Sequence, residues 1–518
     1  MNKIKNIFFL LILLDIQQSY GQQYYNVLKY GARNDSSKLA TAAIARAIAD
    51  ASKAGGGTVY FPAGKYLTGP IHLKSNITIF IDAGAELHFS DNFDDYLPMV
   101  ESRYEGVDVM SFSPLFYAYK AENISIRGRG QINGHGKKWW DFVEGYKKDQ
   151  PRSKWQLLFD SLNKNILMPD DSAQTKRGFL RPPFIQPMYC KNVLVEGITI
   201  RNSPFWTINP EFCENVTVHG VTINNPRSPN TDGINPESCK YVHISDCHIS
   251  VGDDCITIKS GRDIPGRTKN MAAENYTITN CTMLSGHGGV VIGSEMSGSV
   301  RKITISNCVF DGTDRGLRIK TARGRGGVVE DIRIDNIIMK NIGENAFVMD
   351  MQYTKTQPEP VSERTPKFRN IHFSNITAQT KNAGIINGLE EMPIENVTFS
   401  DIQIDADAGF VINKAKGIEF HQVTITTKTG PCFKADNVQD LELDGIKALK
   451  PIVNIPLISF NNVDNALIHN CWPVTGTTNF IQLKGNQTNN INLKGNFLNN
   501  VKVPVLRSEE VTGTIIQE

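Results

Sequence analysis

The chain has 518 residues, of which 40% are hydrophobic and 21% charged, and its formal net charge is +2. This near-neutral balance argues against a nucleic-acid-binding protein, whose domain is usually strongly basic. The length fits two to four ordinary domains or one long repeat structure, and the hydrophobic content is enough for a large core.

The N-terminus has the pattern of an export signal. Two lysines stand within the first five residues, an apolar run follows from Ile7 to Leu14, and Ser19-Tyr20-Gly21 supplies small residues for cleavage. The run is too short to span a bilayer, and no later stretch is long and apolar enough to do so. We expect residues 1–21 to be a signal peptide, residues 22–518 to form one domain, and the protein to be secreted or periplasmic without membrane insertion. The alternative is a buried first strand or helix.

Residues 24–90 have the character of an N-terminal cap and a first turn. Asn26–Ala32 is expected to be a strand that ends in a turn. From Ser37 to Lys53 apolar residues recur at helical spacing, and Gly55-Gly56-Gly57 follows, so we expect a helix that ends there. Such a helix would cover the open end of a repeat structure.

Beyond this cap the chain repeats a short β-type unit. Similar units begin at Asn123-Ile124-Ser125-Ile126, Asn215-Val216-Thr217-Val218 and Asn396-Val397-Thr398-Phe399, and many neighbouring units are ~23–26 residues apart. A propeller blade needs ~40–50 residues, which is too long for this period. We therefore predict an all-β fold: a single right-handed parallel β-helix with an N-terminal capping helix and loop insertions.

Three longer steps between units mark the insertions, at Lys137–Pro183, Ser260–Asn275 and Tyr353–Lys367. The first contains Lys154–Leu162, which we expect to be a helix. Because loops on one side of a rigid scaffold usually carry specificity, we expect the largest insertion to reach over the functional face.

The nine cysteines form no CxxC pair, which argues against a zinc site. Several lie one repeat apart, as Cys255, Cys281 and Cys308 do, so we expect most of them to be small apolar residues stacked in the core. An odd count leaves at least one thiol free within a monomer.

Two acidic motifs fall at solenoid spacing, Asn230-Thr231-Asp232 and Gly252-Asp253-Asp254. If one turn separates them, their carboxylates stack ~4.8 Å apart. Carboxylates this close repel one another, so at least one pKa should be raised. A protonated carboxyl beside ionised ones is what glycoside hydrolysis requires, as an acid for the leaving oxygen and a base for water.

Two further motifs continue the series, Gly286-His287-Gly288 and Arg318-Ile319-Lys320. His287 stands between glycines that cause no crowding. Arg318 and Lys320 point from the same face of a strand, and together they suit the carboxylate of an anionic sugar. Each motif alone is common in turns, calcium sites or solvated strands; their order at this spacing is what indicates a site.

The four motifs resemble those of glycoside hydrolase family 28, the polygalacturonases. Met283–Ser294 fits the histidine signature of that family, and Tyr353 matches a family tyrosine. The resemblance implies that Asp253 donates the proton, that Asp232 and Asp254 activate water, that His287 supports catalysis, and that the anomeric centre is inverted. It also implies substrate binding by Asn230, Arg318, Lys320 and Tyr353. No metal and no cofactor are implied, and the partner is an acidic polysaccharide or oligosaccharide such as galacturonan or pectin.

The chain departs from the family pattern in two ways. Fungal members often bridge the Cys after Asp-Asp to a Cys four places before the His, but that place holds Met283, so this disulfide is absent. The large insertion, Ser102–Glu105 and Leu180–Pro183 resemble bacterial exo-acting members. We therefore expect hydrolysis of α-1,4-galacturonosyl linkages from the non-reducing end. The alternatives are an endo-polygalacturonase, a hydrolase of rhamnogalacturonan or decorated galacturonan, a pectate-lyase-like β-eliminase, and a non-catalytic glycan-binding β-helix.

Overall fold

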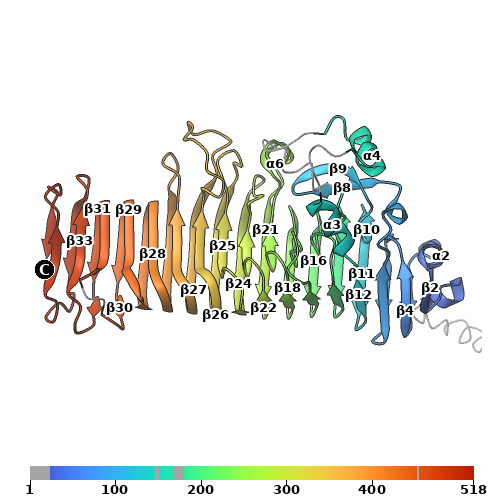
Figure 1. Ribbon diagram of the computed structural model, residues 1–518, viewed down its shortest axis with the longest axis horizontal. Coiled ribbons are helices and arrows are strands. Elements are labelled where there is room, and N and C mark those ends of the chain that lie inside the picture. Colours follow the sequence, from blue (N-terminus) through green and yellow to red (C-terminus); the bar gives the residue numbers. More distant parts are fainter. Residues whose placement is uncertain (1–23, 146–150, 167–179, 452–453, 518) are drawn as a thin grey trace, which may run out of the picture.

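The computed structural model describes residues 24–145, 151–166, 180–451 and 454–517. The expected signal peptide lies outside these ranges and stays a prediction. The described chain winds into a long right-handed parallel β-helix, whose axis runs across Figure 1. The predicted fold class is confirmed.

Strands of successive turns pair in parallel and form three columns along the axis. Column 1 contains β1 (Tyr24–Asn26), β3 (Gly57–Phe61), β6 (Ile77–Ile81), β11 (Glu122–Gly128), β14 (Lys191–Glu196), β16 (Glu214–His219), β18 (Lys240–Ser245), β21 (Ala273–Thr279), β34 (Asn489–Lys494) and β36 (Ile515–Gln517). Column 2 contains β2 (Asp35–Leu39), β4 (Gly64–Thr68), β7 (Ala85–Phe89), β12 (Gln131–Asn133), β15 (Thr199–Arg201), β17 (Thr222–Asn224), β19 (His248–Ser250), β22 (Thr282–Ser285), β30 (Lys447–Ala448) and β32 (Trp472–Pro473).

Column 3 carries the residues of the predicted site. It contains β5 (Ile71–His72), β10 (Phe116–Tyr119), β13 (Ile185–Met188), β20 (Ile256–Ile258), β23 (Val290–Ile292), β25 (Leu317–Lys320), β33 (Asn479–Lys484) and β35 (Val503–Arg507). Six long strands pass from one column to the next: β24 (Val300–Asp311), β26 (Val328–Asp350), β27 (Lys367–Asn387), β28 (Ile394–Thr426), β29 (Thr429–Asp444) and β31 (Pro456–His469). The turns after residue 430 therefore complete the same solenoid.

Asparagine begins many repeats because the corner before column 1 needs left-handed backbone. Asn123, Asn192 and Asn215 have φ values of 54°, 54° and 58°, a region that asparagine tolerates better than most residues. Their side chains also bond from turn to turn: Nδ2 of Asn192 donates to Oδ1 of Asn123 at 2.8 Å, and Nδ2 of Asn215 to Oδ1 of Asn192 at 2.7 Å. The residue that makes the corner therefore also ties neighbouring turns together.

Inward-facing side chains of all turns form one core. In the C-terminal half, the rings of Phe373, Phe399 and Phe420 stack with centroids 4.7 Å apart at each step. The cysteines belong to the same core, since all nine are free and buried. The prediction that most of them are stacked core residues is confirmed.

The N-terminal end is covered by α2 (Thr41–Lys53), which buries Ala and Ile side chains against the first turns. This helix begins later than expected, because Asp35–Leu39 pairs with β4 as β2. The strand predicted over Asn26–Ala32 is wrong beyond its first residue. Its centre is a 3-10 helix, η1 (Val27–Tyr30), because the Asn26 side chain caps the Leu28 N–H and Gly31 closes the turn at a φ of 91°.

The insertions gather on one side of the solenoid (Figure 1). They comprise η2 (Phe93–Tyr96), the antiparallel hairpin of β8 (Val100–Tyr104) and β9 (Val107–Ser111), α3 (Lys137–Glu144), α4 (Lys154–Leu162) and α6 (Asp263–Lys269). The predicted helix Lys154–Leu162 is confirmed, and Ser153 caps it in a reciprocal pair with Gln156. Within the described ranges, no helix is both long and apolar enough to cross a membrane.

Candidate active site

The four sequence motifs meet where column 3 passes four successive turns. Asp232 precedes Ile234, which bridges to Ile256 of β20, and Asp253 and Asp254 directly precede that strand. His287 precedes β23, and Arg318 and Lys320 lie on β25. Each turn thus brings one motif to the same end of the same column.

Asp232, Asp253 and Asp254 form one acidic cluster. One carboxylate oxygen of each lies within 4.8 Å of one oxygen of the other two, as the solenoid spacing predicted. Asp232 is 3% and Asp254 1% exposed, whereas the Asp253 side chain keeps 19% of its surface exposed. Asp253 is therefore the most exposed carboxyl of the cluster.

Burial raises the pKa of Asp232 well above its usual value, and the nearby Asp253 charge raises it further. Lys259 and the hydrogen bond from Asn235 oppose these effects only in part. The expected raised pKa in the cluster therefore occurs at Asp232, which the family resemblance names as a water-activating residue rather than as the acid.

His287 pairs with Asp253 through Nδ1 and Oδ1, which are 3.2 Å apart. Burial acts to raise the pKa of Asp253, but the His287 hydrogen bond and the Lys320 charge outweigh it, so this pKa is lowered. The same hydrogen bond raises the pKa of His287 despite partial burial. This contact therefore favours the protonated form of the imidazole beside Asp253, which the family resemblance names as the proton donor.

The glycines around His287 are required by their surroundings. Gly286 has a φ of 156°, and a Cβ there would lie 2.5 Å from the Asp253 carbonyl oxygen. A Cβ at Gly288 would lie 2.5 Å from the Val291 side chain. The backbone of the histidine motif therefore packs directly on the turn that carries Asp253.

The cation pair on β25 faces Asp254. Lys320 Nζ lies 2.9 Å from Asp254 Oδ2, and Arg318 Nη1 lies 3.8 Å from Oδ1. The ring of Tyr353 lies beside both, with its centroid 5.5 Å from the Arg318 guanidinium carbon and 5.3 Å from Lys320 Nζ. All three side chains line one cavity with the acidic cluster.

This cavity has a volume of about 710 Å³ and is polar on most sides. The tip of the β8–β9 hairpin borders it through Glu105, whose Oε2 lies 3.1 Å from Arg262 Nη1. A Cβ on Gly106 would lie 2.6 Å from the Arg262 backbone nitrogen, so the hairpin tip packs directly against the residue before α6. The hairpin tip and the residue before α6 together form one wall of the cavity.

The two helices of the large insertion do not reach over the functional face, although the sequence had suggested this for the insertion as a whole. Its helices α3 and α4 pack on the Phe93 region, where Trp139 stacks on Phe93 at 4.1 Å and Lys154 pairs with Asp94. Neither helix contributes a residue to the cavity. Residues 167–179 of this insertion lie outside the described ranges. The apolar faces of α3 and α4 pack beside the hairpin, and among the described residues the hairpin tip and Arg262 border the cavity.

The end of that insertion does reach the site. Arg181 Nη2 donates to Oδ1 of Asn230 at 2.7 Å and to the Tyr104 hydroxyl at 3.0 Å. The segments Ser102–Glu105 and Leu180–Pro183, which the sequence singled out together, are therefore neighbours beside the first motif.

Several residues of the site carried no motif signal. Asn235 and Thr257 hydrogen-bond Asp232, and Asp314 lies 3.9 Å from His287. Lys259 Nζ pairs with Glu295 at 2.6 Å beneath the Trp206 ring. Asn235 and Thr257 could have been identified from the repeat period, since each directly follows an isoleucine, Ile234 or Ile256, at the same position of column 3.

The fold and this site define a β-helical glycoside hydrolase: acidic side chains at one point of a solenoid, with cations that can meet an anionic sugar. A family model described as "Glycosyl hydrolases family 28" matches residues 167–427, and one described as "Rhamnogalacturonase A/epimerase, pectate lyase-like" matches residues 24–144. The chain belongs to glycosyl hydrolase family 28, the polygalacturonase family.

Similar proteins include both exo- and endo-acting members by name. A probable polygalacturonase of Vitis vinifera is 30% identical over 392 residues, which cover 73% of this chain and 74% of its own. An endo-polygalacturonase of Pectobacterium carotovorum subsp. carotovorum is 30% identical, with coverage of 73% and 87%. The crystal structure of a hyperthermoactive exopolygalacturonase from Thermotoga maritima matches with a TM-score of 0.67 at 35% identity, covering 75% of this chain and 91% of that one.

Proposed function

We propose that this protein hydrolyses α-1,4-galacturonosyl linkages of pectic galacturonan from the non-reducing end, with inversion and release of single galacturonate residues. The observation that carries the substrate class is the cation pair of Arg318 and Lys320 next to the acidic cluster. A guanidinium and an ammonium that face the same cavity can bind a sugar carboxylate, and Tyr353 can pack against the same sugar.

In the proposed reaction Asp253 protonates the leaving oxygen, because it is the cluster member most exposed to the groove. Asp232 and Asp254 hold the attacking water. His287 supplies charge and a proton beside Asp253, and its raised pKa keeps the imidazole protonated under mildly acidic conditions. Burial favours a proton on Asp232, and its carboxyl lies within 4.8 Å of the other two, so this proton can pass to Asp253 before the reaction.

Inversion rests on the family pattern. Carboxyls ~6.5–9.5 Å apart are typical of inversion and ~5–5.5 Å of retention, and the spacing here is on the shorter side. Two carboxyls that share one water, Asp232 and Asp254, fall outside this two-residue rule. Proton NMR of the first-formed product should show the β anomer, whereas an initial α signal would contradict inversion.

Exo action is supported by the wall that the β8–β9 hairpin and the segment before α6 build at the cavity. A cavity that is closed on one side can bind the end of a polysaccharide chain but not its interior. The test is digestion of polygalacturonate with viscosity and product size followed together. Early monomer with slowly falling viscosity supports exo action; a rapid fall with mixed oligomers means endo action.

A second candidate substrate is rhamnogalacturonan or a decorated galacturonan, which the match of residues 24–144 to a rhamnogalacturonase-type family model favours. Members that place rhamnose in the leaving-group site would not need cations there, so Arg318 and Lys320 favour galacturonate. Product masses from the two polysaccharides, compared over time, distinguish these substrates. Activity that survives a chelator, without unsaturated products, would argue against a calcium-dependent eliminase.

We also propose that the protein is exported, to the periplasm or beyond, on the pattern of residues 1–21. Expression with the full N-terminus, followed by fractionation and N-terminal sequencing, should give a mature chain that starts near residue 22. An uncleaved chain in the cytoplasm would contradict export.

A further inference from the structure

The two carboxylate oxygens of Asp232 have different surroundings. Oδ2 accepts a hydrogen bond from Asn235 Nδ2 at 3.0 Å and another from Thr257 Oγ1 at 3.2 Å. Oδ1 has no hydrogen-bond partner among the described residues, although Asp232 lines the cavity. Hydrogen bonds from the protein therefore fix Oδ2, whereas Oδ1 remains available to accept a proton.

Both donors are held rigidly by the solenoid. Asn235 and Thr257 are fully buried and follow one another in column 3. The Asn235 N–H donates to the Ile208 carbonyl at 2.7 Å, and the Thr257 N–H donates to the Ile234 carbonyl at 2.9 Å. These bonds fix the backbone from which both side chains reach Asp232, and full burial leaves the side chains little room to turn away.

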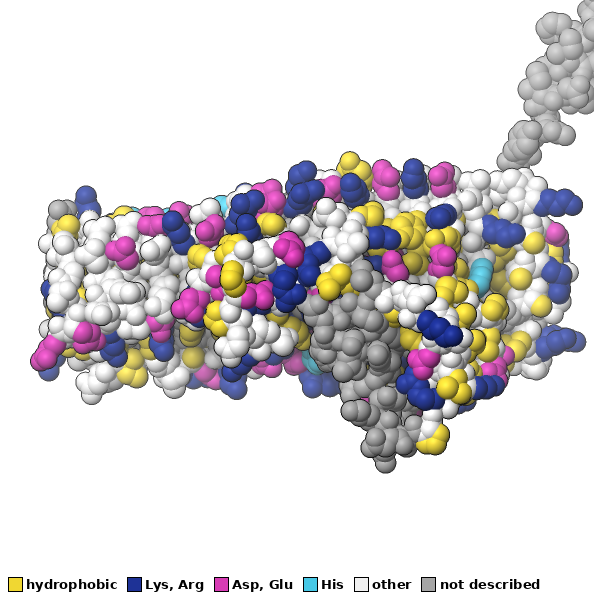
Figure 2. All heavy atoms as spheres, turned by 90° about the horizontal axis from the view of Figure 1, so that it is seen from above, with side chains coloured by type: hydrophobic (Ala, Val, Ile, Leu, Met, Phe, Trp, Pro, Cys, Tyr) yellow, Lys and Arg dark blue, Asp and Glu magenta, His cyan; other side chains and the backbone are white. Residues whose placement is uncertain are grey.

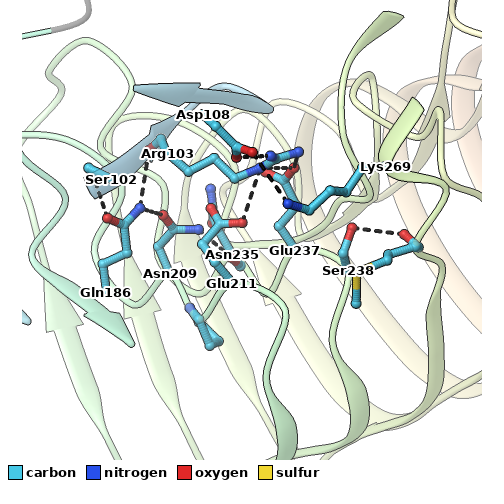
Figure 3. Close-up of polar contacts among 12 residues, drawn as sticks. Ser102, Arg103, Asp108, Gln186, Asn209, Glu211, Asn235, Glu237, Ser238 and Lys269 are labelled. Atoms are coloured by element: carbon cyan, nitrogen blue, oxygen red, sulfur yellow. Dashed lines mark hydrogen bonds and ion pairs between the residues drawn. The ribbon is translucent and has the colours of Figure 1, made fainter. Parts of the chain in front are cut away.

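A column of buried amides supports Asn235 from the N-terminal side, as Figure 3 shows. Nδ2 of Asn209 donates to the Asn235 carbonyl at 2.9 Å, and Nε2 of Gln186 donates to Oδ1 of Asn209 at 2.9 Å. The β8–β9 hairpin covers this column, because Gln186 also contacts the Ser102 hydroxyl at 2.8 Å and the Arg103 carbonyl at 3.1 Å. The hairpin thus excludes water from the amides behind the acidic cluster.

We propose that Asn235 and Thr257 are positioning residues, which occupy Oδ2 of Asp232 and so make Oδ1 the oxygen that accepts the proton of the attacking water. This inference rests on the proposed hydrolysis. Before that step a proton passes from Asp232 to Asp253, whose carboxylate oxygens lie within 4.8 Å of each other, and this leaves Asp232 charged and Asp253 protonated. The water oxygen then bonds to the anomeric carbon and one water proton passes to Oδ1 of Asp232. The glycosidic C–O bond breaks, and its oxygen takes the proton of Asp253, so that Asp232 ends protonated and Asp253 ends charged.

The donors also favour the charged form of Asp232, which burial opposes. Removing one donor should therefore make the charge costlier and leave the carboxylate free to rotate. If Thr257 had only a packing role, its replacement by valine would leave the charge on Asp232 unaffected, since valine fills the volume of threonine and keeps the strand.

The test compares Thr257→Val with Thr257→Ser in the full-length protein, using polygalacturonate as substrate. Thr257→Val should lower kcat about 10- to 100-fold with little change in KM, because the base is misplaced. The acid limb of kcat/KM against pH should move up by about 0.5–1 unit. Thr257→Ser keeps the hydroxyl and should restore most of the activity and the pH profile. Thr427→Val, a buried threonine on a distant turn, is the matched control and should leave both unchanged.

A second measurement does not depend on the substrate. If Thr257 supports the charge on Asp232, the fall in Tm caused by Thr257→Val is larger at pH 8 than at pH 4. An unchanged acid limb, or an equal fall in Tm at both pH values, would overturn the inference. Wild-type protein that fails to cleave galacturonan would instead overturn the proposed function, and the Tm comparison would still judge the contact with Asp232.

Discussion

Three carboxyl groups lie close together on neighbouring turns with little solvent around them. The free-energy cost of ionising them therefore differs from one group to the next. Burial raises the pKa of Asp232, while the His287 hydrogen bond lowers the pKa of Asp253. In the proposed reaction, activity therefore depends on the transfer of one proton among groups within 4.8 Å of one another.

Replacing Asp253 by Asn should remove the acid and retain the fold. The amide keeps the shape of the side chain but has no proton to give to the leaving oxygen. We expect a loss of about 10²–10⁴-fold in kcat, measured by reducing-sugar release. The circular dichroism spectrum and Tm provide the control. Near-normal hydrolysis would show that another group is the acid.

Replacing Asp232 by Asn should stabilise the protein at neutral pH while abolishing activity. An aspartate whose pKa is raised on folding binds its proton more tightly in the folded state, so stability falls as pH rises from 3.8 through the raised pKa. The neutral amide removes this loss and can still accept from Asn235 and Thr257. We expect a Tm gain of about 1–3 °C at pH 7–8 that disappears near pH 4. A gain of equal size at both pH values would speak against a titrating Asp232.

Lys320→Ala should weaken cleavage of charged galacturonan more than cleavage of its methyl ester. The ammonium can bind the sugar carboxylate, an interaction that esterification removes. We expect kcat/KM to fall about 10- to 100-fold on the acid and clearly less on the ester, in parallel assays. Equal losses on both substrates would indicate that Lys320 acts through its contact with Asp254 alone.

Residues with a chemical signature could be predicted from the sequence, because Asp, His, Arg and Lys at solenoid spacing are uncommon by chance. Asn235 and Thr257 resemble ordinary strand residues in sequence, and only the register of column 3 shows that both donate to Asp232. Asp232 itself was expected, but the sequence did not show that the raised pKa would fall on it, because burial is the main cause of that shift.

Among the elements, the β8–β9 hairpin departs most from the repeat pattern. Arg103 is 1% exposed and lies between two buried acids on successive turns of column 3. Its guanidinium is 3.4 Å from Glu211 and 2.8 Å from Glu237, and Asp108 also pairs with it. Burial first, and then the repulsion between these two glutamates, raises the pKa of Glu211. One arginine thus fixes the hairpin to the solenoid.

Arg103→Met should loosen this hairpin. Methionine fills part of the volume but leaves two buried carboxyls without their cation, a loss of about 3–5 kcal/mol in the free energy of unfolding. The loss should be smaller at pH 5 than at pH 8, because protonated glutamates need no partner. Denaturant unfolding at both pH values measures it. Asp108→Asn, at a half-exposed partner, is the control and should cost less than about 1 kcal/mol.

The sequence indicated this hairpin only as a resemblance in Ser102–Glu105, because its anchors are far away in the chain. Glu211 and Glu237 lie over a hundred residues beyond Arg103. For the same reason the role of the wall was assigned to Lys137–Pro183. The helix Lys154–Leu162 was predicted, but the surface that it covers depends on tertiary contacts with Phe93.

At the scale of the whole molecule, each turn touches only its neighbours, so stability is close to a sum of adjacent interfaces. The repeat period was readable in the sequence because it is a local pattern. The 3-10 helix at Val27–Tyr30 was not, because a single side-chain cap at Asn26 decides it.

Phe399→Ala should therefore act locally. It removes a ring stacked on both sides in the core, a loss of about 3–5 kcal/mol. We expect the C-terminal turns to become sensitive to protease at temperatures where the catalytic turns remain folded and active. Limited proteolysis followed by mass spectrometry measures this. Simultaneous loss of activity and of all turns would mean that the solenoid unfolds as one unit.

The three columns also bear on how such an enzyme can diversify. Because the proposed site occupies four consecutive turns, duplication or loss of a whole turn near either end should leave its residues in place. Loss of a few residues inside a turn would instead displace one catalytic motif against the next. Insertions and deletions in this architecture should therefore be found as complete turns at the ends and as loops at the corners. The four turns from Asp232 to Lys320 should keep their lengths.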